Sequence, residues 1–264
     1  MIAIVDTHAH LDDASFAGDL ETVMQRAADA GVSRVVVPAI DRGNWEAVAS
    51  LAAADERVAA GYGLHPLMLE RHRDEHLDER PGWLDTHPHV AVGEIGLDFY
   101  VEGLEPSRQR EIFTRQLDLA GERKLPVIVH ARRALEEVTL TLRRHKGLRG
   151  VVHSFAGSAE QARQLFDHGF MLGIGGPVTY ERARRLREVV RTMPLEFLLL
   201  ETDSPDQPLH GHQGRRNEPA LTASVLGTVA ALREESAEAI ARATTANAAR
   251  LFGWAPGSGS QGRP

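Results

Sequence analysis

The feature that most constrains this chain is a repeated alternation of short apolar runs with longer segments of helical spacing. Some runs are apolar on both faces, as in the valines at 35–37 and the leucines at 198–200. Such runs are typical of parallel strands that helices cover on both sides. Eight strands are expected: Ile2–Asp6, Arg34–Ala39, Ala59–Gly63, Val90–Glu94, Pro126–His130, Gly150–His153, Phe170–Ile174 and Phe197–Glu201.

The segments between these runs carry apolar residues at helical spacing. Helices are expected over Asp19–Ala30, Pro106–Glu122, Arg132–His145, Ala159–His168, Tyr180–Arg191, Ala220–Leu232 and Ser236–Leu251. Strands that alternate with helices form βαβ units, and eight of them fit an α/β fold, a closed (β/α)8 TIM-like barrel. The alternative, an open doubly wound sheet, needs a Gly-rich phosphate loop after the first strand, where this chain has His8-Ala9-His10.

The length of 264 residues suits one large α/β domain or two small ones. Because no internal repeat or linker divides it, we expect a single barrel over 1–254 and a flexible, Gly/Ser/Pro-rich tail over 255–264. No run approaches the roughly 20 apolar residues of a membrane span. The opening apolar residues reach Asp6 too soon for a secretion signal. The expectation is a cytoplasmic protein with no membrane contact and no obligate protein partner.

The expected strand ends carry histidines and carboxylates, and function in such barrels gathers at the C-terminal ends of the strands. With no cysteine in the chain, any metal must bind His and carboxylate ligands. The segments concerned are Asp6-Thr7-His8-Ala9-His10, Gly63-Leu64-His65-Pro66, Gly93-Glu94-Ile95-Gly96-Leu97-Asp98, Val129-His130, Val152-His153-Ser154 and Glu201-Thr202-Asp203-Ser204-Pro205.

The distribution of the 13 histidines strengthens this interpretation. A lone histidine is weak evidence for a ligand, but five fall at expected strand ends. His8 and His10 have the period-two spacing that puts both side chains on one face of an extended segment. Asp6 is expected to orient a histidine by a hydrogen bond. The other eight are expected to be solvated surface residues: His72, His76, His87, His89, His145, His168, His210 and His212.

Three or four imidazoles and two carboxylates exceed what one tetrahedral ion needs. Two divalent ions about 3.5–4 Å apart, bridged by a carboxylate, would use them all. Ligands of these types accept Zn²⁺, Mg²⁺ or Mn²⁺. The net charge of −7 argues against non-specific nucleic-acid binding, so any such contact must be confined to a local site.

Taken in order, these motifs resemble the TatD family of metal-dependent deoxyribonucleases, within the amidohydrolase-like barrels. The match runs from residue 1 to about 253, and Asn217-Glu218-Pro219 is similar to the family's late Asn-x-Pro motif. The loop Asp206-Gln207-Pro208-Leu209 departs from the commoner version and resembles the YjjV-like branch of uncharacterised hydrolases. This departure bears on the substrate and not on the metal site.

The resemblance implies a role for each strand-end residue. One metal would bind His8, His10 and Asp203, a second would bind His130 and His153, and Glu94 would bridge the two. His65 would lie near the substrate and bind or polarise a phosphate oxygen. Many related barrels use a carbamylated lysine as the bridge, but this chain has no lysine before Lys124, so Glu94 supplies the carboxylate instead.

The expected activity is metal-dependent hydrolysis of a phosphodiester by a metal-activated water, with Asp203 orienting the water or taking its proton. The resemblance suggests 3′–5′ exonucleolytic attack on single-stranded DNA or DNA ends. Arg132 and Arg133 are candidates for phosphate contacts, and an exposed helix face is the other interpretation of both. A hydrolase of a small ester, amide, lactone or phosphoester would have the same site. A non-catalytic scaffold is disfavoured because all six expected ligands are present.

Overall fold

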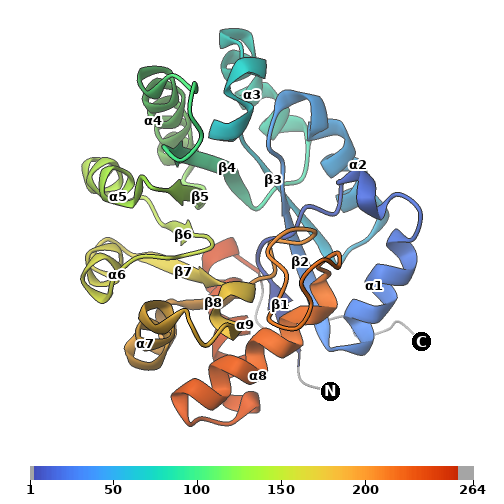
Figure 1. Ribbon diagram of the computed structural model, residues 1–264. Coiled ribbons are helices and arrows are strands. Elements are labelled where there is room, and N and C mark those ends of the chain that lie inside the picture. Colours follow the sequence, from blue (N-terminus) through green and yellow to red (C-terminus); the bar gives the residue numbers. More distant parts are fainter. Residues whose placement is uncertain (1–2, 255–264) are drawn as a thin grey trace.

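The computed structural model describes residues 3–254, in which eight parallel strands form one sheet in the order β1 to β8. Each expected strand is present, and the (β/α)8 barrel is confirmed (Figure 1). The predicted tail over 255–264 lies outside the described residues. The strands are β1 Ile4–Asp6, β2 Val32–Pro38, β3 Val58–Tyr62, β4 Ala91–Asp98, β5 Val127–Arg132, β6 Gly150–Val152, β7 Phe170–Ile174 and β8 Leu198–Leu200.

The barrel is nearly closed by contacts between the segments that follow β8 and β1. The Thr7 N–H donates to the carbonyl of Leu200 at 3.0 Å, and the Asp203 N–H donates to the carbonyl of His8 at 2.9 Å. Ala9 and Ser204 form a parallel bridge. These backbone hydrogen bonds therefore hold the segment with His8 and His10 beside the segment with Asp203.

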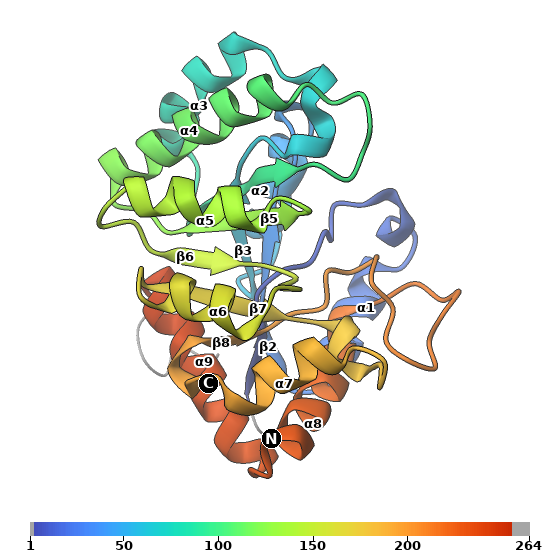
Figure 2. The same cartoon turned by 60° about the vertical axis from the view of Figure 1, so that its left-hand side comes forward.

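Helices surround the sheet, and short 3-10 turns occupy several loops (Figures 1 and 2). The helices are α1 Leu20–Asp29, α2 Trp45–Ala54, α3 Asp74–Thr86, α4 Pro106–Arg123, α5 Leu135–Arg144, α6 Ala159–Phe166, α7 Arg184–Thr192, α8 Thr222–Arg233 and α9 Ala237–Phe252. None of the helices within residues 3–254 is long and apolar enough to cross a membrane.

The interior of the barrel is apolar at the N-terminal ends of the strands. Each strand contributes one buried residue there, and Leu251 and Phe252 of α9 pack onto this cluster from below. The eight strand residues are Val5, Val36, Ala59, Ala91, Ile128, Val151, Met171 and Leu199. Since this end is filled and covered, polar side chains that point inward gather at the opposite, C-terminal end.

Several element bounds differ from the sequence expectation. Helices α2 and α3 were not among the expected helices. Helix α3 is mostly polar and contains Pro81, so its sequence shows no clear helical periodicity. The expected helix over Arg132–His145 begins only at Leu135, so Arg132 ends β5 instead. Strand β4 extends to Asp98, four residues past the expected end, because the residues after Glu94 pair in register with β5.

The glycines of β4 allow a close approach of β4 and β5. A Cβ on Gly96 would lie 2.0 Å from the carbonyl oxygen of His130, and Gly96 has a positive φ of 146°. A Cβ on Gly93 would lie 2.6 Å from Cβ of Ile128. Only glycine fits at these positions, which bring β4 and its Glu94 against β5.

Candidate metal centre

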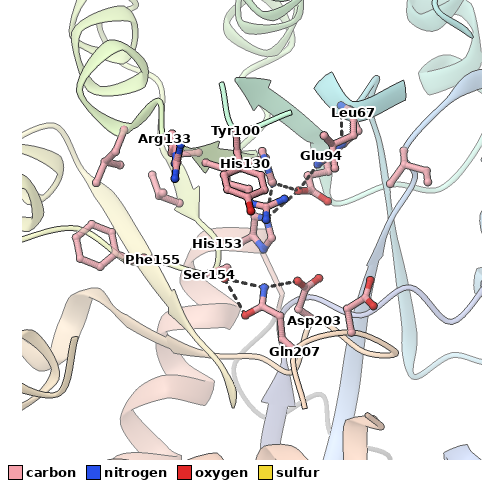
Figure 3. A pocket seen from close by; sticks show the side chains of 18 of the residues that line it. Leu67, Glu94, Tyr100, His130, Arg133, His153, Ser154, Phe155, Asp203 and Gln207 are labelled. Atoms are coloured by element: carbon pink, nitrogen blue, oxygen red, sulfur yellow. Dashed lines mark hydrogen bonds and ion pairs between the residues drawn. The ribbon is translucent and has the colours of Figure 1, made fainter. Parts of the chain in front are cut away.

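The six residues predicted as metal ligands converge at the C-terminal end of the barrel. They come from five segments, and Glu94 contacts imidazoles through both of its oxygens. Figure 3 shows Glu94 beside His130 and His153. Glu94 and His8 are buried, and His10 is partly exposed. The two carboxylate oxygens of Glu94 face different sets of imidazoles, so the group divides into two halves.

The first half surrounds Glu94 Oε2. His8 Nε2 lies 3.1 Å from it and His10 Nε2 lies 3.6 Å from it. The two imidazole nitrogens are 3.2 Å apart, and each lies 3.6 Å from Asp203 Oδ1. Donors about 2.0–2.1 Å from one tetrahedral cation would be separated by about 3.3–3.4 Å. The donor spacing therefore fits a single cation.

The second half surrounds Glu94 Oε1. His153 Nε2 lies 2.7 Å from this oxygen and His130 Nδ1 lies 3.2 Å from it. These two nitrogens are 3.4 Å apart. A third imidazole atom, His65 Nε2, lies 3.0 Å from the same oxygen. One carboxylate thus touches both halves, as a bridging ligand requires.

His65 differs from the other histidines in its hydrogen bonds. Its Nδ1 accepts the backbone N–H of Leu67 at 3.1 Å, so the neutral ring carries its proton on Nε2. This Nε2–H points to Glu94 as a donor and offers no lone pair to a cation. The arrangement suits a residue that donates to an oxygen beside the metals.

Two buried carboxylates contact histidines of the group, and the sequence suggested no role for either. Asp98 Oδ2 accepts Nε2–H of His130 at 2.9 Å, which leaves the Nδ1 lone pair facing Glu94. Glu201 Oε1 lies 3.8 Å from Nδ1 of His153 and accepts the backbone N–H of Ser154 at 2.5 Å. Asp98 shares the even spacing of Glu94 along β4, a signal that could have found it.

Two expectations about polar residues are wrong. Asp6 orients no imidazole; it accepts the backbone N–H of His8 at 3.2 Å, and the N–H and hydroxyl of Thr202. It therefore holds the backbone of two loops together. His72 is buried and not solvated, because its ring donates to the carbonyl oxygen of His65 at 2.8 Å.

The buried carboxylates and imidazoles of the group shift one another's pKa values. Burial would lower the pKa of His10, but the neighbouring carboxylates of Asp203 and Glu94 raise it to about 9. Burial would likewise lower the pKa of His153, but the Glu94 charge raises it to about 10. Burial would raise the pKa of Glu94, yet the surrounding imidazoles hold it well below its usual range. Protons on the imidazoles can thus balance the negative charge of Glu94, and a bound cation would displace them.

A cavity of about 1210 Å³ opens directly onto the two halves of the group (Figure 3). Its wall includes His10, His65 and Asp203, together with Tyr100 and Phe155. The volume lies above the usual range for small-ligand pockets. An extended substrate such as a short oligonucleotide therefore has room beside the metal donors.

One side of this cavity carries arginines without acidic partners. The guanidinium carbons of Arg132 and Arg133 lie 3.7 and 4.7 Å from the ring centroid of Tyr100. Neither arginine pairs with a carboxylate within the described part of the chain. Because Arg133 has a positive φ of 52° and Arg132 ends β5, both lie before the helix and not on its exposed face. Their N–H groups are available to an anion.

The chain is similar in sequence and structure to metal-dependent hydrolases. Residues 5–253 match the family described as TatD related DNase. The chain is 44% identical over 251 residues to the uncharacterized metal-dependent hydrolase YjjV of Escherichia coli, covering 94% of this chain and 97% of that protein. It is 38% identical to the uncharacterized metal-dependent hydrolase YabD of Bacillus subtilis, covering 94% and 98%. The crystal structure of YjjV, 43% identical, superposes with a TM-score of 0.93 over 96% of this chain and 99% of that one.

Proposed function

Because the chain belongs to the TatD-related DNase family and is a metal-dependent hydrolase, we propose that it hydrolyses phosphodiester bonds in DNA. The proposed substrate is single-stranded DNA or a DNA end, cleaved in the 3′–5′ direction. The proposal rests on the Glu94 carboxylate, whose two oxygens contact two separate sets of imidazoles. The cavity beside them is lined by arginines that form no ion pair with a carboxylate of the described residues. The proposal keeps the cytoplasmic location expected from the sequence.

The residues present fit two divalent cations. His8, His10 and Asp203 would hold one, His130 and His153 would hold the other, and Glu94 would contact both. His8 and His10 approach each other through their Nε2 atoms, 3.2 Å apart, while the buried Nδ1 of each ring has no hydrogen-bond partner, so Nε2 is the atom that each ring would offer to a cation. When bound, such cations lower the pKa of water and stabilise negative charge on phosphoryl oxygens. Zn²⁺, Mg²⁺ and Mn²⁺ are all compatible with these ligand types.

The chain's own residues would supply orientation and proton acceptance. Asp203 Oδ1 faces the donor group and would accept a hydrogen bond, or a proton, from the attacking water. His65 Nε2–H, which now donates to Glu94, would donate to a phosphate oxygen as charge develops there. Arg132 would bind a phosphate of the strand, with Tyr100 supporting its guanidinium.

The test combines metal analysis with a substrate assay. We expect purified protein to contain divalent metal, and chelation to abolish cleavage of end-labelled single-stranded DNA. Glu94→Gln and Asp203→Asn should lose most of the cleavage. Metal-free wild type that retains full activity would refute the metal assignment, and a metal-loaded protein that cleaves no DNA would refute the substrate.

A second candidate is a hydrolase of a small ester, amide or phosphoester with the same metal site. One observation favours it: the cavity also carries Asp12, Asp13 and Asp206, which repel a polyanion. A panel that compares single-stranded DNA with small esters and amides separates the two. Cleavage of DNA should also weaken steeply with ionic strength, whereas hydrolysis of a neutral ester should not.

A further inference from the structure

The Asp203 carboxylate is held at both oxygens by different parts of the protein. Oδ1 faces the imidazoles of His8 and His10, at 3.6 Å from each. Oδ2 accepts the side-chain amide of Gln207 at 2.5 Å. We infer that Gln207 is a positioning residue, which together with Ser154 fixes the rotation of the Asp203 carboxylate so that Oδ1 faces the metal donors. The link to metal binding rests on the function proposed above.

The orientation of the Gln207 amide follows from hydrogen-bonding rules. An ionised carboxylate only accepts, so the atom that faces Asp203 must be Nε2. Ser154 Oγ lies 2.8 Å from the same Nε2 and 3.0 Å from Oε1. The hydroxyl can therefore donate to Oε1 and hold the amide plane, as Figure 3 shows with Gln207 between Ser154 and Asp203.

A carboxylate needs such a partner, because its terminal torsion has no sharp rotamer preference. Packing alone would leave the Asp203 oxygens free to rotate, whereas the amide bond to Oδ2 selects one orientation. A metal ligand that is already oriented loses less freedom when a cation binds. Contacts of this kind to ligand side chains commonly change metal affinity about 10-fold or more.

The backbone around these three residues is built to keep them in place. Ser154, Asp203 and Gln207 have φ values of 46°, 57° and 50°, in the left-handed region that is strained for a residue other than glycine. The Gln207 carbonyl accepts the buried Asn217 amide at 3.2 Å. On its other side, a Cβ on Gly176 would lie 2.3 Å from that carbonyl. These two contacts hold the Gln207 carbonyl in place.

Ser154 and Gln207 also connect the two carboxylates that follow β8, those of Glu201 and Asp203. The Ser154 N–H donates to Glu201, while its hydroxyl contacts the Gln207 amide that binds Asp203. Neither bond is a surface contact, since Glu201 is buried and Asp203 is largely buried. A change at Gln207 should thus alter one metal ligand without removing any ligand atom.

The test measures Mn²⁺ binding to metal-free protein by calorimetry, with no substrate present. Gln207→Met keeps the length of the side chain and removes the amide; we expect Mn²⁺ to bind one of its sites about 10-fold more weakly. The matched control is Gln25→Met, because Gln25 on the exposed face of α1 also donates to an aspartate, Asp29, at 2.9 Å. The control should bind Mn²⁺ as wild type does, and both variants should melt near wild type without metal.

A second variant keeps the inference testable if Gln207→Met folds poorly. Ser154→Gly removes the hydroxyl at a φ that glycine adopts freely, and we expect about threefold weaker Mn²⁺ binding at the same site. Adding Gln207→Met to Ser154→Gly should weaken it by less than the product of the two single effects, because both act through Asp203. Wild-type Mn²⁺ affinity in either single variant overturns the inference. Since no DNA is present, that result is distinct from a failure of the proposed DNA cleavage.

Discussion

Asp98→Asn is the substitution whose effect follows most directly from the hydrogen bonds of the site. Asp98 Oδ1 accepts the N–H groups of Tyr100 and Val101 at 2.9 and 3.3 Å, while Oδ2 accepts Nε2–H of His130 at 2.9 Å. Asparagine has one side-chain oxygen, so its NH₂ group must face one of these two sides. The oxygen satisfies two donors if it stays with the backbone, so we expect the NH₂ group to face His130.

That orientation reverses the role of the imidazole. The NH₂ group of the introduced asparagine would donate to Nε2 of His130, which moves the ring proton to Nδ1. Nδ1 would then donate to Glu94 Oε1, 3.2 Å away, and no longer offer a lone pair to a cation. Loss of such an orienting contact weakens metal binding about 10- to 100-fold, or about 1.4–2.7 kcal/mol.

The assay is calorimetric titration of metal-free protein with Mn²⁺. In Asp98→Asn we expect weakening at one site, formed by His130 and His153, and a change within about threefold at the other. Asp29→Asn, on the exposed face of α1, makes the same chemical change far from the centre and should leave both sites unaltered. Wild-type affinity at both sites, or equal loss at both, would refute the reasoning.

Three further predictions concern neighbouring residues. Burial lowers the pKa of His72 to about 4, so protonation of this residue costs the folded state nothing above pH 6.5, and the free energy of unfolding falls by roughly 2–3 kcal/mol as the pH falls to 4. His72→Gln should flatten this part of the pH profile of the free energy of unfolding, measured with urea. An unchanged slope would contradict the prediction. Arg132→Gln should raise KM for DNA and make the slope of log affinity against log salt concentration smaller by about one. Arg182→Gln removes a cation–π contact to Tyr180 and should change neither quantity. His65→Gln should lower turnover with metal content nearly intact; loss of metal would show that His65 is a ligand.

Much of the architecture could be predicted because the strands are buried on both faces. Their β-branched runs, as in Val35 and Val37, reflect that burial, and the strand order followed from alternation with helices. The convergence of the strand-end side chains then followed from the topology of a barrel. Helix α3 could not be predicted in this way, because Leu77 and Leu84 are its only buried apolar residues and tertiary packing holds the rest.

The finer parts of the site depend on backbone conformations that no local pattern announces. Arg133 and Gln207 both have a positive φ, which the residues around them in the sequence do not indicate. The extension of β4 to Asp98 depends on pairing with β5, although the even spacing from Glu94 places Asp98 on the same face of the strand. The role of Gln207 depends on contacts between the loops that follow β6 and β8.

The central claim is that Glu94 contacts two cations, one through each oxygen. The most direct test is a crystal of the protein soaked in Mn²⁺ and measured for anomalous scattering. We expect two peaks on opposite sides of the Glu94 carboxylate, one beside His8, His10 and Asp203 and the other beside His130 and His153. A single peak, or peaks that do not touch Glu94, would contradict it.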